Sequence, residues 1–146
     1  MSFSPHKFRE IIFQLLYARS LGSDGEKIVS FVMEHLEVTR KWVQEAHIVV
    51  EEILQSVSWI DQRIQDHVDD YSLDRLGSVE KNILRLAVHE LQKSMTPYKV
   101  VIAEAIRLVR KFSTPESGKL INAVLDAIVQ ERIIEAHGES SVISVS

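Results

Sequence analysis

Residues 78–93 read SVEKNILRLAVHELQK, and this stretch decides the fold class more clearly than any other part of the chain. Its apolar side chains return every three or four residues, as Val79, Ile83, Leu86, Ala87 and Leu91. That spacing places them on one face of an α-helix. Ser78 precedes the first of them, where a hydroxyl can cap the opening turn. We therefore predict an amphipathic helix over these residues.

The three prolines mark further helix starts, because each follows a hydroxyl residue. The pairs are Ser4-Pro5, Thr96-Pro97 and Thr114-Pro115. A Ser or Thr side chain can accept a hydrogen bond from a free N–H group of the first helical turn. Proline at the next position gives up only an N–H group that had no partner. Helices are expected to begin at all three sites.

Apolar periodicity extends these helices over the whole chain, and no segment alternates in the two-residue pattern of a strand. The fold class is therefore all-α, with about seven helices. The predicted segments are 5–21, 26–36, 39–57, 58–68, 78–93, 97–112 and 115–134, with 71–76 as a short connector. We expect one domain over 1–135, with halves 1–70 and 71–135 that meet at the acidic stretch 66–74. Residues 136–146 are expected to form a disordered tail.

Length and composition set the broad class. The chain has 146 residues, of which 45% are hydrophobic and none is cysteine. That length suits one domain, and the absence of cysteine excludes disulfides, a cysteine nucleophile and cysteine-ligated metals. No apolar run is long enough to cross a membrane, and Met1–Lys7 lacks the apolar core of a signal peptide. We expect a cytoplasmic protein without a membrane partner.

The net charge of −4 is unevenly distributed. Residues 1–22 carry +2, residues 23–76 carry −7, and residues 77–146 carry +1. The total argues against a general polyanion binder. The asymmetry still allows one face that binds nucleic acid, although from charge alone chance segregation on solvated faces is the favoured explanation.

Motifs for catalysis or metal binding are missing from the sequence. The stretch His89–Lys93 begins like a zinc-protease motif but has lysine where the second histidine is needed. The neighbouring carboxylates Glu51-Glu52 and Asp69-Asp70 point about 100° apart on a helix, so neither pair forms an acid–base dyad. There is no glycine-rich phosphate loop and no nucleophile elbow. We expect a binding protein rather than an enzyme, with no cofactor and no metal.

Two groups of cations are candidates for a nucleic-acid contact. In the helix from Pro97, Arg107, Arg110 and Lys111 share one face, and Lys119 follows the next helix start. That start also offers free N–H groups, although Glu116 occupies part of their positive field. The second group is His6, Lys7 and Arg9, whose charges oppose the dipole of the first helix. The alternative for both groups is a solvated basic face. Tyr17 and Leu21 form an apolar pair that suits either the core or an interface.

Five segments, in this order and at these separations, resemble the NusB family of bacterial transcription antitermination factors. The resemblance covers residues 8–128. The three strongest segments are Val79–Leu91, Pro97–Ile106 and Gly118–Asp126. The fourth lies in the first helix and consists of Arg9-Glu10 followed by Gln14–Tyr17, and the fifth is the connector Tyr71–Leu76.

The resemblance implies a fold, a ligand and partners. The family fold is all-α, with two packed helical bundles. Its members bind the boxA element of ribosomal RNA leader transcripts together with NusE, a ribosomal protein, and join RNA polymerase during antitermination. By match, the RNA contacts are His6, Lys7, Arg9, Glu116, Lys119 and Leu120; Arg107, Arg110 and Lys111 are added from their spacing. The NusE contacts by match are Tyr17, Leu21 and Glu80.

Two departures from the family pattern bear on RNA affinity. Many members begin with a run of arginines, whereas this chain has only His6, Lys7 and Arg9, which predicts fewer phosphate contacts. Many members also have an aromatic residue at the position of Leu120, and stacking on a base contributes about 1–3 kcal/mol. We hypothesise that the chain binds single-stranded RNA weakly alone and usefully only with NusE.

Other interpretations stay open at this stage. A NusB-like domain also occurs as the RNA-binding part of ribosomal RNA methyltransferases, and a homodimer with a masked RNA face is possible. Asn122 and Asp126 lie in the last helix, where Asn is a poor helix former. We expect structural roles for both: Asn122 bonding to the loop before Pro97, and Asp126 pairing with Lys81 or Arg85.

Overall fold

A computed structural model describes residues 4–22, 30–31, 33–35, 37–68 and 76–145, with side chains as far as Ile133. Within these residues the chain is helical and contains no strand. The helices with described bounds are α1 (Pro5–Ser20), α3 (Arg40–Gln55), α4 (Val57–Gln65), α5 (Ser78–Lys93), α6 (Tyr98–Phe112) and α7 (Pro115–Val145). Residues 30–31 and 33–35 are helical as well. The predicted all-α fold is confirmed.

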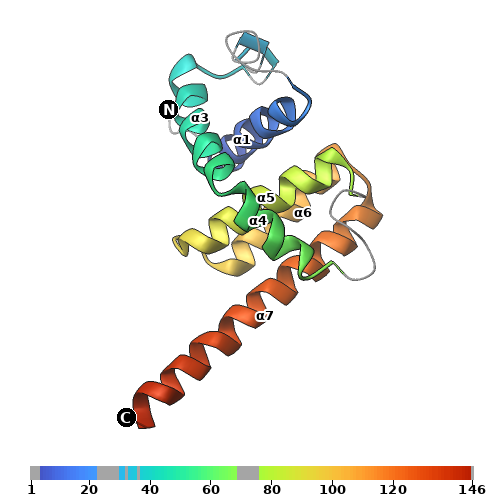
Figure 1. Ribbon diagram of the computed structural model, residues 1–146. Coiled ribbons are helices and arrows are strands. Elements are labelled where there is room, and N and C mark those ends of the chain that lie inside the picture. The colour runs from blue at the N-terminus through green and yellow to red at the C-terminus, as the bar shows by residue number, and fades with distance from the viewer. Residues whose placement is uncertain (1–3, 23–29, 32, 36, 69–75, 146) are drawn as a thin grey trace.

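The helices form two packed bundles that share α5 (Figure 1). Helices α1 and α3 pack together in the first bundle, and α4, α6 and α7 pack against α5 in the second. Contacts of α1 with α5 and of α3 with α4 join the two bundles. Figure 1 shows α7 as one long helix whose C-terminal part extends beyond the rest of the molecule.

The core explains why the apolar periodicity predicted these helices. Each of the six helices with described bounds contributes large buried side chains, including Phe13, Ile53, Ile64, Leu84, Leu108 and Ile121. The stripe predicted from residues 78–93 faces inward, and Ile83, Leu86, Ala87 and Leu91 are all buried. Burial of such a stripe supplies most of a helix's stability in a protein of this size.

Two of the three proline starts are confirmed, and the third differs. Ser4 Oγ accepts a hydrogen bond from the backbone N–H of Lys7, with Pro5 in the first turn of α1. Thr114 Oγ1 accepts one from the backbone N–H of Ser117 in the same way. Helix α6 begins instead at Tyr98, with Pro97 as its N-cap and no side-chain cap. The expected cap from Thr96 is therefore wrong.

The C-terminal prediction also differs from the structure. The last helix was expected to end near Ile134, and residues 136–146 were expected to be a disordered tail; in the structure the backbone of α7 is helical to Val145. Gly138 is the strongest helix breaker in this stretch, and one interior glycine costs only about 1 kcal/mol relative to alanine. Much of the predicted helix 26–36 and the connector 71–76 lies outside the described residues.

Candidate nucleic-acid interface

A buried carboxylate lies at the centre of the predicted basic surface. Glu10 of α1 is only 6% exposed. Its Oε1 accepts a hydrogen bond from Arg107 Nη1 at 2.8 Å, and its Oε2 accepts one from Lys111 Nζ at 3.0 Å. Burial raises the pKa of the Glu10 carboxyl, but the bonds from Arg107 and Lys111 lower it by more, so it lies below its usual value. Both cations from α6 are thus paired within the protein.

The same network includes a second buried carboxylate, Glu104 of α6. Arg107 Nε donates to it at 3.0 Å, and Arg107 Nη2 donates to the backbone carbonyl of His6 at 2.9 Å. The imidazole Nδ1 of His6 lies against the Glu104 carboxylate. Arg107 therefore contacts three groups at the α1–α6 contact, and its position is fixed without RNA. The predicted cations at this contact do lie together, but carboxylates partly neutralise them.

Arg9 is also held by a carboxylate. Its Nε donates to Oε2 of Glu90 in α5 at 3.0 Å, and its Nη2 donates to Oε1 at 2.8 Å, in the two-pronged geometry of a strong guanidinium–carboxylate pair. Only 12% of the Arg9 side chain is exposed. This pair joins α1 to α5, and it leaves Arg9 little surface for a phosphate group.

Three of the predicted cations have no such partner. Lys7 in α1, Arg110 in α6 and Lys119 in α7 form no ion pair with any residue that the structure describes. Arg110 and Lys119 are exposed, and Lys7 is half-buried. Their charges are available to an external anion, which makes them the strongest candidates for phosphate contact.

The start of α7 carries the other predicted RNA residues. Glu116 is exposed in the first turn, and Leu120 is partly buried against the core. A Cβ atom at Gly118 would lie 3.7 Å from Val109 Cγ1 of α6, so α6 and α7 approach closely here. Helix α6 also contacts the first turns of α1 through Arg107, so it touches both of the helices that carry the other cations. No described hydrogen bond or ion pair joins α1 directly to the first turn of α7.

The residues predicted to contact NusE behave differently from one another. Tyr17 is half-buried and stacks on Phe13, with ring centroids 6.0 Å apart. Leu21, which follows α1, is 59% exposed. Glu80 is half-buried and accepts hydrogen bonds from the hydroxyls of Ser113 and Ser117. Of the three, Leu21 therefore offers the most exposed side chain to a partner protein.

The structural roles expected for Asn122 and Asp126 are not seen. Both side chains are exposed on α7, and Arg85 pairs with Asp61 at 2.8 Å instead of Asp126. The apolar periodicity of α7 buries Ile121, Val124 and Leu125 and thereby places position 122 outward. The buried amide belongs to Asn82, whose Nδ2 atom donates to Ser20 Oγ at 3.1 Å and thereby links α5 to α1.

Sequence reasoning missed the two carboxylates that hold the cations. One of them had a usable signal: Glu104 lies within the apolar stripe that includes Val101, Ala105 and Leu108, and a charged group on an inward face needs a partner. Glu10 had no such signal, because its partners Arg107 and Lys111 lie on α6, 97 and 101 positions along the chain.

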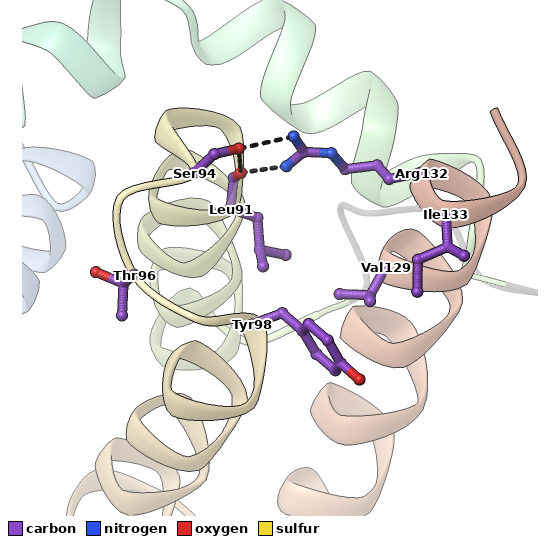
Figure 2. Close-up of a pocket in the computed structure, with 7 residues that line it drawn as sticks. All are labelled: Leu91, Ser94, Thr96, Tyr98, Val129, Arg132 and Ile133. Atoms are coloured by element: carbon purple, nitrogen blue, oxygen red, sulfur yellow. Dashed lines mark hydrogen bonds between the residues drawn. The ribbon is translucent and has the colours of Figure 1, made fainter. Parts of the chain in front are cut away.

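A pocket of about 310 Å³ lies away from these residues, at the C-terminal end of α5 (Figure 2). Figure 2 shows Arg132 of α7 reaching the carbonyl of Leu91 and the hydroxyl of Ser94, with Nη2 at 2.9 Å from Ser94 Oγ. A cation there stabilises the last carbonyls of α5.

Within the described residues, no group of three or more His, Cys, Asp or Glu side chains could hold a metal ion. No helix there is long and apolar enough to span a membrane.

Comparison with known proteins decides the family. The model of the NusB family matches residues 6–130, which is most of the chain. This chain belongs to the NusB family. It is 31% identical to the transcription antitermination protein NusB of Thermodesulfovibrio yellowstonii, over 92% of this chain and 96% of that protein. It is 35% identical to the NusB of Nitratiruptor sp., over 86% and 91%.

Solved NusB structures share the fold. T. maritima NusB superposes with a TM-score of 0.75 at 30% identity, covering 90% of this chain and 94% of that one. A chain from a crystal structure of antitermination factors NusB and NusE in complex with double-stranded RNA gives a TM-score of 0.73 at 32% identity, covering 86% and 96%. The two-bundle fold inferred from the resemblance is thereby confirmed.

Proposed function

We propose that this NusB-family chain is a transcription antitermination factor that binds boxA-type leader RNA together with a NusE-type ribosomal protein. The observation that carries the proposal is family membership over residues 6–130, with relatives named for antitermination that match nearly their full length. A related structure that contains NusB, NusE and RNA supports the ligand and the partner. The complex then joins RNA polymerase in the cytoplasm, and its role requires binding rather than catalysis.

The RNA surface proposed here centres on the cations without an internal partner, Lys7, Arg110 and Lys119. They come from α1, α6 and α7, so a strand that crosses α6 could contact all three. The paired residues His6, Arg9, Arg107 and Lys111 order this surface and add partial charge. Glu116 and Leu120 border the contact at Lys119. Phosphate contacts of this kind orient RNA and depend strongly on salt.

The surface proposed for the ribosomal protein lies at the C-terminal end of α1. Leu21 supplies an exposed apolar side chain, and Tyr17 lies one turn before it in α1. Glu80 lies in the first turn of α5, which the bond from Asn82 to Ser20 links to this end of α1. We propose that residues 1–135 act as one domain that presents both surfaces.

Single-stranded RNA is the proposed ligand, although the related complex contains double-stranded RNA. The major groove of an RNA duplex is too narrow for side chains to distinguish bases, so sequence is recognised mainly in single strands. A duplex could still contact the same cations through its phosphates.

The proposal is tested by copurification with the ribosomal protein, followed by electrophoretic shifts with boxA-type RNA and a scrambled control. We expect the complex to prefer boxA-type RNA and to bind it more tightly than the chain alone. A second arm combines Lys7→Glu with Lys119→Glu, which is expected to lower RNA affinity while the thermal melt stays unchanged. Binding equal to that of the unaltered chain would show that the surface is misplaced.

A further inference from the structure

One carboxylate ties together three helix ends close to the proposed RNA surface. Glu80 is in the first turn of α5, and Ser113 and Ser117 lie at the end of α6 and in the first turn of α7. Glu80 Oε1 accepts a hydrogen bond from Ser117 Oγ at 2.9 Å and another from the Ser113 hydroxyl. The two serine hydroxyls are also 3.2 Å apart. The connection between α6 and α7 is therefore anchored to α5 by one oxygen atom.

The other oxygen of the Glu80 carboxylate explains the glycine that precedes α5. A Cβ atom at Gly77 would lie 2.5 Å from Glu80 Oε2, so any side chain there would displace the Glu80 carboxylate from its present position. The φ of Gly77 is −64°, which every residue can adopt, so the backbone itself does not require glycine. The glycine makes room for the folded-back carboxylate.

The charge of Glu80 is maintained in this position. Burial raises the pKa of the Glu80 carboxyl, but the bonds from Ser113, its own backbone N–H and Ser117 lower it by more, so the net pKa lies below its usual value. An ionised carboxylate makes stronger hydrogen bonds to hydroxyls than a neutral one. The three-residue cluster is thus stable near neutral pH.

We propose that Glu80 is a positioning residue for RNA binding, and that it acts through Ser113 and Ser117 rather than by touching RNA. The cluster fixes the direction in which α7 leaves α6. Lys119 and Leu120 lie just beyond Ser117, so their placement depends on that direction. This inference depends on the proposed function, because it requires the start of α7 to contact RNA. It also gives Glu80 a role separate from the partner contact that the family resemblance implies.

The test separates the two roles with variants on either side of the hydrogen bonds. The double variant Ser113→Ala/Ser117→Ala removes both donors and leaves the carboxylate in place. Glu80→Ala removes the acceptor, Glu80→Gln keeps an acceptor of the same shape, and Gly77→Ala displaces the carboxylate without straining the backbone. Ser78→Ala is the matched control, because the exposed Ser78 side chain makes no hydrogen bond with a described residue. Lys119→Glu is the control for the RNA site.

The full chain is titrated with boxA-type single-stranded RNA well below its melting temperature, with and without the ribosomal protein. We expect the serine double variant, Glu80→Ala and Gly77→Ala each to weaken RNA binding about tenfold. Glu80→Gln and Ser78→Ala should stay within about twofold of the unaltered chain. Combining Glu80→Ala with the two serine changes should weaken binding no further, because all three act on one cluster. Affinity of the serine double variant for the ribosomal protein should be unchanged.

Two results would overturn the inference while leaving the proposed function intact. The serine double variant could bind RNA normally although Lys119→Glu abolishes binding. The losses from Glu80→Ala and the serine changes could instead add, which would show that Glu80 acts independently of them. If Lys119→Glu has no effect, the RNA site proposed at α7 is wrong and this inference fails with it.

Discussion

The α1–α6 contact and the first turns of α7 carry similar cations but treat them differently. At the α1–α6 contact, Arg107 and Lys111 are paired with the buried Glu10. On the outer side of α6 and at the start of α7, Arg110 and Lys119 are exposed and pair with no described residue. In the first region the cations form ion pairs that hold helices together, and in the second region the cations are exposed to solvent.

The difference teaches that a basic residue in a sequence is not yet a binding charge. A phosphate group must compete with any carboxylate already bonded to the cation. A buried carboxylate is a strong competitor, because losing the cation would leave its charge buried and poorly solvated. The exposed cations have only water to displace. The two regions should therefore respond in opposite ways to substitution, one through stability and the other through RNA affinity.

The largest effect is expected from the unpaired cations. Arg110→Glu combined with Lys119→Glu should weaken RNA binding about 100-fold at moderate salt, because two phosphate attractions become repulsions. The thermal melt should change little, since neither side chain has a described partner. Binding is measured by fluorescence anisotropy over a salt series, and stability by circular dichroism.

The comparison variant for that experiment is Arg107→Gln combined with Lys111→Gln. It removes two cations from the paired region and should lower the melting temperature more than it lowers RNA affinity. If this variant instead loses RNA binding while keeping its stability, the two regions have been assigned the wrong way round.

The next largest effect is expected at the carboxylate that the paired cations share. Glu10→Gln keeps the shape of the side chain but leaves Arg107 and Lys111 without their counter-charge. Breaking a buried ion pair costs about 3–5 kcal/mol, and we expect about 2 kcal/mol here because both cations are partly exposed. Chemical denaturation measures the loss, with Glu116→Gln as the control because Glu116 is exposed. A loss as small as that of the control would show that the pairing contributes nothing to stability.

The sequence predicted the fold well because a helical core leaves a repeating signal. The stripe of residues 78–93 is buried, and Pro5 and Pro115 begin helices as expected. The all-α class follows from spacing alone. The two-bundle arrangement came from the family resemblance, because spacing does not say which helices pack together.

The candidate site was only partly predictable, because pairing depends on distant residues. Arg9 and Glu90 are 81 positions apart, and Arg107 and Glu10 are 97 apart. Nothing local to an arginine shows that such a partner exists. The internal bonds of Glu80 were hidden for the same reason, because Ser113 and Ser117 are 33 and 37 positions away. The outward placement of Asn122, by contrast, follows from the local apolar periodicity of α7.

The smallest expected effect is a dependence of the paired region on pH. The pKa of the Glu10 carboxyl is lower in the folded protein than its usual value, so the folded state binds its proton less readily than the unfolded chain does. The stability that Glu10 contributes is therefore complete above its unfolded pKa and is lost as the pH falls through the folded pKa. Glu10→Gln lacks this contribution at every pH, so its unfolding free energy should fall less steeply on acidification. The difference between the unaltered chain and the variant should be largest near pH 7 and should shrink below about pH 4. Urea denaturation at several pH values measures it, and a difference that stays constant with pH would mean that Glu10 does not act through its charge.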